Sequence, residues 1–217
     1  MTSTFIPLKV SSLNDNSAFK PEKISAIIIT KNEEKNIKAC LDSLDFVDEV
    51  ILVDSGSTDK TIEIAQTYEK VKIIQTQWFG FVENKKIALA QTKHNWVLWV
   101  DADEIVPKEL ADEWLNRAQS APFNQTGAIS IPRKTFFLLH LVKHSGWYPN
   151  RVIRFFHKER ASFNTNILHE GLIINDGYHV EEFKNDLLHY SYHSLFQYFQ
   201  KMNSYGHAGA QELERKG

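Results

Sequence analysis

Residues 24–53 read ISAIIITKNEEKNIKACLDSLDFVDEVILV, and this stretch decides the fold. Residues 24–29 form a nearly continuous apolar run rich in β-branched side chains, as expected for a strand that is covered on both faces. A second run of the same kind follows at residues 50–53. Between these runs, apolar side chains recur at the spacing of a helix, at Ile37, Leu41 and Leu44. The stretch therefore predicts two parallel strands joined by a right-handed helical crossover.

The same alternation continues along the first half of the chain. Further strands are expected at residues 71–74 and 96–100, and further helices around residues 62–68 and 83–91. Asn32 follows the first strand and would cap the helix after it. The repetition predicts an α/β fold of the Rossmann-like kind, in which helices flank a mainly parallel sheet.

The second half of the sequence has a different pattern. Strands are expected at residues 128–131 and 152–156, with short aromatic loops between them. An amphipathic helix is expected from residue 194 onward. These elements would add mixed strands to the parallel sheet and form a second pocket beside it.

We expect a single domain at residues 23–217, preceded by a loosely ordered extension at residues 1–22. Within the domain, residues 23–125 would bind the nucleotide part of a ligand. Residues 126–217 would shape a second pocket.

Composition narrows the functional class. The formal net charge of −2 gives no overall attraction to nucleic acid or to acidic lipid. The single cysteine, Cys40, excludes an internal disulfide and fits a reducing compartment. No secretory signal and no run of about 18 apolar residues is visible, which predicts a cytoplasmic protein with at most peripheral contact with the inner membrane.

A cluster of carboxylates follows the expected strand at residues 96–100. Asp101, Asp103 and Glu104 lie at its carboxyl end, where open α/β sheets bind ligands. Strand alternation would direct Asp101 and Asp103 to the same side, a spacing that suits Mg²⁺ or Mn²⁺ bound together with a diphosphate. The alternative is that these acids only begin the following helix.

Other strand ends carry further polar side chains. Asp54 would accept hydrogen bonds from a ribose or a base, or it would only form a turn. Thr30 and Asn32 offer polar contacts after the first strand. Lys85 and Lys86 would neutralise phosphate, or they would be solvated lysines on a helix surface.

Three motifs together resemble family 2 glycosyltransferases of the GT-A fold. They are IIITKNEE at residues 27–34, VDSGSTD at residues 53–59 and VDADE at residues 100–104. Later motifs resemble the bacterial subgroup that adds glucose or a similar hexose to the lipopolysaccharide inner core. These are GWYP at 146–149, RFF at 154–156, LHE at 168–170 and LHYSY at 188–192. In that subgroup we expect more chain after the terminal helix than this sequence has.

The resemblance implies roles for the residues at the donor site. Asp54 would hold the nucleoside, with Thr30, Asn32 and Glu33 beside it. Asp101 would lie near the ribose and the metal, Asp103 would ligate the metal directly, and His189 would complete the metal shell.

The resemblance also implies the acceptor chemistry. Glu170 would deprotonate the acceptor hydroxyl, and His169 would either orient Glu170 or serve as the base itself. Arg133, Arg151 and Arg154 would bind phosphates of an anionic acceptor or form surface ion pairs.

The resemblance, together with the carboxylates at the strand ends, thus implies a metal-dependent inverting glycosyltransferase. It would move a hexose, glucose being the first candidate, from a UDP-linked donor to a lipopolysaccharide core or to another glycan or lipid-linked acceptor. Two alternatives stay open: a nucleotide-sugar-binding protein without turnover, and a sugar nucleotidyltransferase. The nucleotidyltransferase would carry a glycine-rich phosphate loop after the first strand, whereas this loop reads TKNEEKN.

Overall fold

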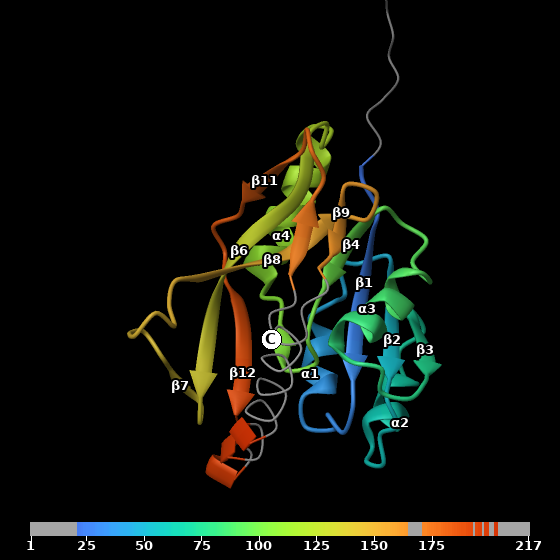
Figure 1. The fold of residues 1–217 in the computed structure, drawn as a ribbon, viewed down its shortest axis with the longest axis vertical. Coiled ribbons are helices and arrows are strands. Elements are labelled where there is room, and N and C mark those ends of the chain that lie inside the picture. Colours follow the sequence, from blue (N-terminus) through green and yellow to red (C-terminus); the bar gives the residue numbers. More distant parts are fainter. Residues whose placement is uncertain (1–20, 165–170, 193, 197, 200–201, 204–217) are drawn as a thin grey trace, which may run out of the picture.

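The computed structural model describes residues 21–164, 171–192, 194–196, 198–199 and 202–203 (Figure 1). Its centre is one sheet of ten strands. Eight of them follow the order β3-β2-β1-β4-β8-β6-β12-β5, and the other two, β7 and β11, each pair with β6. One continuous sheet therefore joins both halves of the expected domain.

The first half forms the parallel part of this sheet, as expected. Its strands are β1 (Ile24–Thr30), β2 (Glu49–Asp54), β3 (Val71–Gln75) and β4 (Trp96–Trp99). β1 pairs in parallel with both β2 and β4, and β2 pairs in parallel with β3. The helices between and after them are α1 (Ile37–Asp42), α2 (Thr61–Ala65), α3 (Phe81–Leu89) and α4 (Lys108–Ser120).

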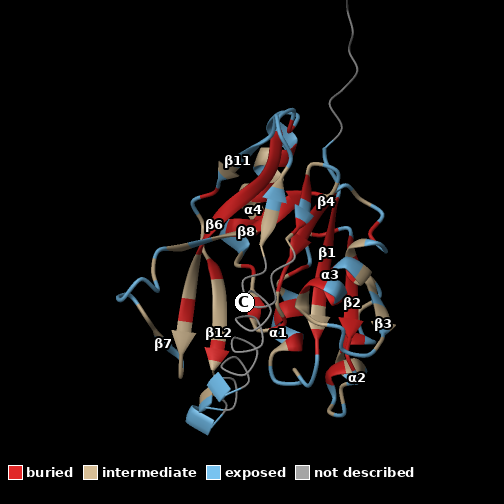
Figure 2. Cartoon of the chain, in the orientation of Figure 1, coloured by how far each residue is buried: buried red, intermediate tan, exposed pale blue. Residues whose placement is uncertain are grey.

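Apolar side chains cover both faces of the parallel strands. Along β1, Ile24, Ala26 and Ile28 join a core cluster that also receives the apolar faces of α1 and α4. Ile27 of β1 faces the opposite side, in a second cluster that contains residues of α3. Because a strand with two covered faces has no polar face, the β1 run is nearly continuous in the sequence. Figure 2 shows β1, β2 and β4 buried along most of their length, whereas the outer strand β3 is only partly buried.

The second half adds antiparallel and parallel strands. β8 (Asn150–His157) runs antiparallel to both β4 and β6 (Thr126–Phe137). β12 (Leu187–Tyr192) pairs in parallel with β6 and antiparallel with the short β5 (Glu104–Ile105). The remaining strands are β7 (His140–Leu141), β9 (Ala161–Phe163), β10 (Leu172–Ile174) and β11 (His179–Glu182). The expected strands at 128–131 and 152–156 are therefore confirmed, and both are longer than predicted.

The loop after β1 differs from the prediction at Asn32. Asn32 does not cap α1, because α1 begins after Asn36 and the side chain of Asn32 instead accepts a hydrogen bond from the backbone of Thr58 at 2.8 Å. Its backbone has a positive φ of 57°, a conformation that asparagine adopts more readily than most residues.

Among the described residues, no helix is both long and apolar enough to cross a membrane.

Candidate active site

The carboxyl ends of the parallel strands bring the predicted donor-site residues to one edge of the sheet. Thr30 at the end of β1 lies opposite Asp54 at the end of β2 in the strand register. Asp101 follows the end of β4, which pairs with the other side of β1. Ligands of open α/β sheets bind at this kind of edge, so the topology supports the predicted location of the site.

The carboxylate of Asp101 is surrounded by cationic and hydrogen-bonding groups. Its Oδ2 accepts a hydrogen bond from Arg154 Nη2 at 2.7 Å, and its Oδ1 accepts one from Trp99 Nε1 at 3.0 Å. Lys85 Nζ lies 3.8 Å from Oδ1. Burial alone would raise the pKa of Asp101, but the charges of Arg154 and Lys85 outweigh it and hold that pKa well below its usual range. Asp101 is therefore a fixed anion whose two oxygens already accept bonds from the protein.

Lys85 and Arg154 both contact the indole ring of Trp99. Lys85 Nζ lies 3.6 Å from a ring centroid of Trp99, and Arg154 Cζ lies 4.3 Å from one. Lys85 is completely buried, so the solvated-lysine interpretation is wrong for this residue. It does describe the neighbouring Lys86, which is half-exposed and pairs with Glu83 at 2.8 Å. Cation–π contacts of this kind stabilise a desolvated charge by about 2 kcal/mol or more.

Glu104 extends the same network into the core. Its side chain is fully buried, and its Oε1 accepts hydrogen bonds from Arg154 Nη2 at 2.6 Å and Arg133 Nη1 at 3.4 Å. Its Oε2 accepts a bond from the backbone N–H of Asp101 at 3.1 Å. Glu104 belongs to β5, whereas α4 begins only at Lys108. The interpretation of these acids as the start of a helix is therefore wrong for Glu104.

Asp103 and His189 face one another across two neighbouring strands. Asp103 Oδ2 lies 3.6 Å from His189 Nε2. Strand pairing brings these two side chains together. His189 of β12 pairs with Glu104 of β5, and the carbonyl of Asp103 accepts a hydrogen bond from Tyr190 N at 2.9 Å. Both side chains are largely buried, and Ser191 Oγ lies 3.1 Å from His189 Nδ1.

This pair suits a divalent cation that takes its other ligands from elsewhere. A carboxylate oxygen and an imidazole nitrogen at this separation can bind the same ion, and Mg²⁺ or Mn²⁺ usually keeps waters and takes oxygens from a substrate diphosphate. Within the described ranges, no cluster of three or more His, Cys, Asp or Glu side chains could hold a metal. The metal role of Asp101 stays a prediction, since its oxygens are bonded to Arg154 and Trp99.

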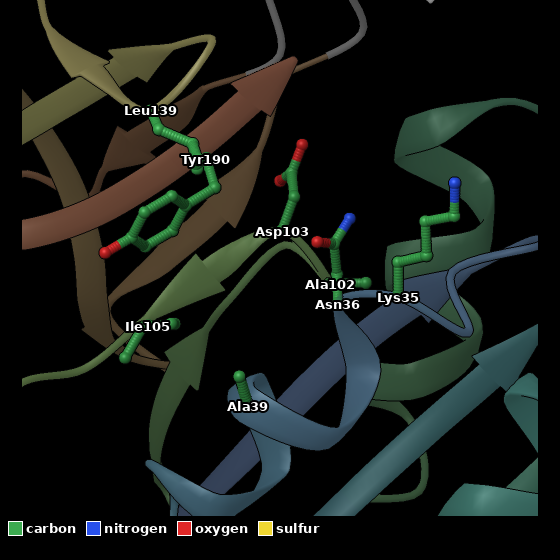
Figure 3. A pocket seen from close by; sticks show the side chains of 8 residues that line it. All are labelled: Lys35, Asn36, Ala39, Ala102, Asp103, Ile105, Leu139 and Tyr190. Carbon is green, nitrogen blue, oxygen red and sulfur yellow. The ribbon is translucent and has the colours of Figure 1, made fainter. Parts of the chain in front are cut away.

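A pocket of about 230 Å³ opens beside Asp103. In Figure 3, Asp103 points into the same open space as Asn36 and Lys35, with Tyr190 and Leu139 on the other side. Its remaining walls are small or apolar, from Ala39, Ala102 and Ile105. The predicted metal ligand is thus reachable from a cavity.

The residues predicted to contact the nucleoside connect two loops. Asp54 is fully buried, and its Oδ2 accepts backbone bonds from Gly56 at 3.0 Å and Ser57 at 2.9 Å, while Ser57 Oγ donates to Oδ1. Ser57 Oγ also accepts the backbone N–H of Asn32 at 2.8 Å. These contacts are those of the turn-forming alternative, and the nucleoside role of Asp54 and Asn32 stays a prediction.

The other two residues of that set differ in their contacts. Thr30 Oγ1 is buried and has no hydrogen-bond partner within the described part of the chain, and its contact with a ligand stays a prediction. Glu33 accepts a side-chain bond from Asn36 at 2.7 Å, and its backbone N–H donates to Thr61 Oγ1 at 2.8 Å. Glu33 therefore supports the entry to α1 in this structure.

The remaining candidates divide into two groups. Glu170 and His169 lie outside the described residues. Arg151 lies at the surface, where it pairs with Glu182 at 3.6 Å and donates to the carbonyls of Ser130 at 2.7 Å and Phe183 at 2.8 Å. Arg133 and Arg154 instead pair with the buried Glu104. Sequence reasoning missed Trp99 altogether, although its position two residues before Asp101 was a usable signal.

The chain is similar to known glycosyltransferases in sequence and in structure. The model of the family described as Glycosyl transferase family 2 matches residues 25–176. An uncharacterized glycosyltransferase of Rickettsia typhi is 34% identical over 206 residues, which are 90% of this chain and 70% of that protein. The lipopolysaccharide core biosynthesis glycosyltransferase LpsC of Rhizobium meliloti is 37% identical over 93 residues, which are 41% of this chain and 34% of that protein.

A solved structure agrees with the fold. The mannosyltransferase PcManGT from Pyrobaculum calidifontis, in complex with GDP-Man and Mn²⁺, matches with a TM-score of 0.60 at 18% identity. The match covers 89% of this chain and 62% of that chain, so this chain spans less than two thirds of the solved protein. The fold is the GT-A fold, and the chain belongs to glycosyl transferase family 2.

Proposed function

We propose that this protein is a metal-dependent inverting glycosyltransferase that takes a hexose from a nucleotide sugar. The observation that carries the proposal is the pair of Asp103 and His189, 3.6 Å apart, next to the half-buried anion Asp101 at the carboxyl edge of the parallel strands. An acidic site that also contains an imidazole suits a cation and a diphosphate better than it suits an anionic ligand alone.

The metal would be Mg²⁺ or Mn²⁺, held by Asp103 and His189. A bound divalent cation would neutralise the diphosphate as it leaves the sugar. The structure of PcManGT with GDP-Man and Mn²⁺ supports a cation and a nucleotide sugar together in this fold. Lys85 stays our candidate for a diphosphate contact, since its ammonium lies 3.8 Å from Asp101 Oδ1, although it is buried against Trp99 here and would have to become accessible to reach a phosphate.

The donor would be a UDP-hexose, with glucose as the first sugar to test. Thr30, Asn32, Glu33 and Asp54 would contact the nucleoside from the ends of β1 and β2. Residues 23–125 would thus form the nucleotide-sugar-binding half of the domain.

The acceptor would be a lipopolysaccharide core or another glycan or lipid-linked sugar, bound by residues 126–217. The similarity to LpsC, a lipopolysaccharide core biosynthesis glycosyltransferase, supports this class. Glu170 would remove the proton of the attacking hydroxyl, with His169 as orienting group or alternative base. Inversion follows from a single displacement, which needs no covalent nucleophile. Such an acceptor would bring the protein into peripheral contact with the inner membrane.

A turnover screen tests the proposal against its two alternatives. We expect the protein to release UDP from a UDP-hexose in the presence of Mn²⁺, and we expect EDTA to abolish this release. A binding protein without turnover would bind the nucleotide sugar and release nothing. A nucleotidyltransferase would instead form a nucleotide sugar and pyrophosphate from UTP and a sugar phosphate.

A further inference from the structure

We propose that Arg154 is a positioning residue that holds residues 101–104 so that Asp103 faces His189. This inference rests on the proposed metal site. The Nη2 of Arg154 bridges the two carboxylates that flank Asp103, namely Asp101 Oδ2 at 2.7 Å and Glu104 Oε1 at 2.6 Å. One guanidinium nitrogen therefore holds both ends of the segment that contains Asp103.

The segment is also held along its backbone. Glu104 Oε2 accepts the N–H of Asp101 at 3.1 Å, and the N–H of Glu104 donates to the carbonyl of Asp101 at 2.9 Å. Glu104 then enters β5, where it pairs with His189. A shift of Glu104 would consequently move the Asp103 carboxylate relative to the imidazole of His189.

Charge explains why an arginine occupies this position. Glu104 is fully buried and Arg154 is only 5% exposed, so both charges are desolvated. Two carboxylates on one short segment repel each other unless a cation lies between them, and removing one member of a buried ion pair leaves an uncompensated charge. The planar guanidinium suits this bridge, because its donors have a fixed geometry.

Trp99 supports the guanidinium from the side. Arg154 Cζ lies 4.3 Å from a ring centroid of Trp99, whose Nε1 donates to Asp101 Oδ1. The indole thus contacts the bridging cation and one of the two bridged carboxylates. A side chain that is fixed by packing and by further hydrogen bonds orients its neighbours more accurately than a side chain without such contacts.

Mn²⁺ affinity measures this role directly. The concentration of free Mn²⁺ is followed by electron paramagnetic resonance in the presence of UDP, for the wild type and for Arg154→Met. We expect Arg154→Met to bind Mn²⁺ about 10- to 100-fold more weakly, the range found when outer partners of metal ligands are removed. The matched control is Arg151→Met, on the same strand, whose guanidinium bonds Ser130 and Phe183; its Mn²⁺ affinity should equal that of the wild type.

A conservative variant keeps the test informative if Arg154→Met does not fold. Arg154→Lys retains the charge but not the planar geometry, and we expect it to fold and to bind Mn²⁺ several-fold more weakly than the wild type. Wild-type affinity in a folded Arg154→Met, or in Arg154→Lys when the methionine variant is unfolded, would overturn the positioning role. Failure of the wild type itself to bind Mn²⁺ would overturn the proposed function, and the positioning role with it.

Discussion

Replacing Asp103 by asparagine is expected to slow the metal-dependent release of UDP from the nucleotide sugar about a thousandfold. The Asp103 carboxylate would supply the anionic ligand of the pair, 3.6 Å from His189 Nε2. An amide keeps the shape and loses the charge, so the cation and its stabilisation of the leaving group would be lost. That stabilisation amounts to several kcal/mol, and each 1.4 kcal/mol is about a factor of ten in rate.

The measurement is the rate of UDP release from the active nucleotide sugar with saturating Mn²⁺. Asp112→Asn is the control, because Asp112 is an exposed carboxylate on α4 that pairs with Lys108. The control should retain the wild-type rate, and the melting temperature should show that Asp103→Asn is folded. A folded Asp103→Asn with the wild-type rate would contradict the metal assignment.

Replacing Glu170 by glutamine is expected to lower transfer about 100- to 10,000-fold while leaving donor binding unchanged. The reason is that a general base contributes roughly this factor, and an amide cannot take up the proton of the acceptor hydroxyl. Release of UDP from the donor into water, which needs the same deprotonation, should fall in parallel.

The comparison with His169→Gln separates the two candidate bases. If Glu170 is the base and His169 orients it, the histidine variant should lose a smaller factor. Near-normal transfer by Glu170→Gln, together with a severe loss in His169→Gln, would move the base to the histidine. UDP affinity, measured with Mn²⁺, is the readout that keeps donor binding apart from the chemical step in both variants.

Much of the parallel half could be predicted because its signals are local. The β1 run from Ile24 is apolar on both faces, and the carboxylates after β4 interrupt a buried strand. Such patterns identify a strand and its carboxyl end without knowledge of its neighbours. The position of Asp101 and Asp103 at the edge of the sheet followed from those two facts.

The arrangement within the site could not be predicted, because it depends on long-range pairing. His189 reaches Asp103 only because β12 pairs with β5, a two-residue strand with no sequence signature of its own. The burial of Lys85 against Trp99 and the bridge made by Arg154 likewise require the packed sheet. A charged residue considered by itself is expected at the surface. Here, ion pairs formed in the folded structure allow these charged side chains to be buried.

The loop after β1 shows how a local rule can fail. Asparagine before a helix is a common cap, yet Asn32 lies several residues before α1 and adopts a positive φ. Its side chain bonds the backbone of Thr58 in the neighbouring loop. The bond between two loops at the strand ends replaces the cap, and it shapes the edge where the nucleoside is proposed to bind.

Calorimetric titration of UDP into the wild-type protein, with and without Mn²⁺, tests the central claim most directly. The proposed site predicts saturable UDP binding that requires Mn²⁺ and is lost when EDTA is added. Binding of equal strength without the metal would contradict the metal role of Asp103 and His189. No binding of UDP or of any other nucleoside diphosphate by the folded protein, with or without Mn²⁺, would contradict the proposed donor site as a whole.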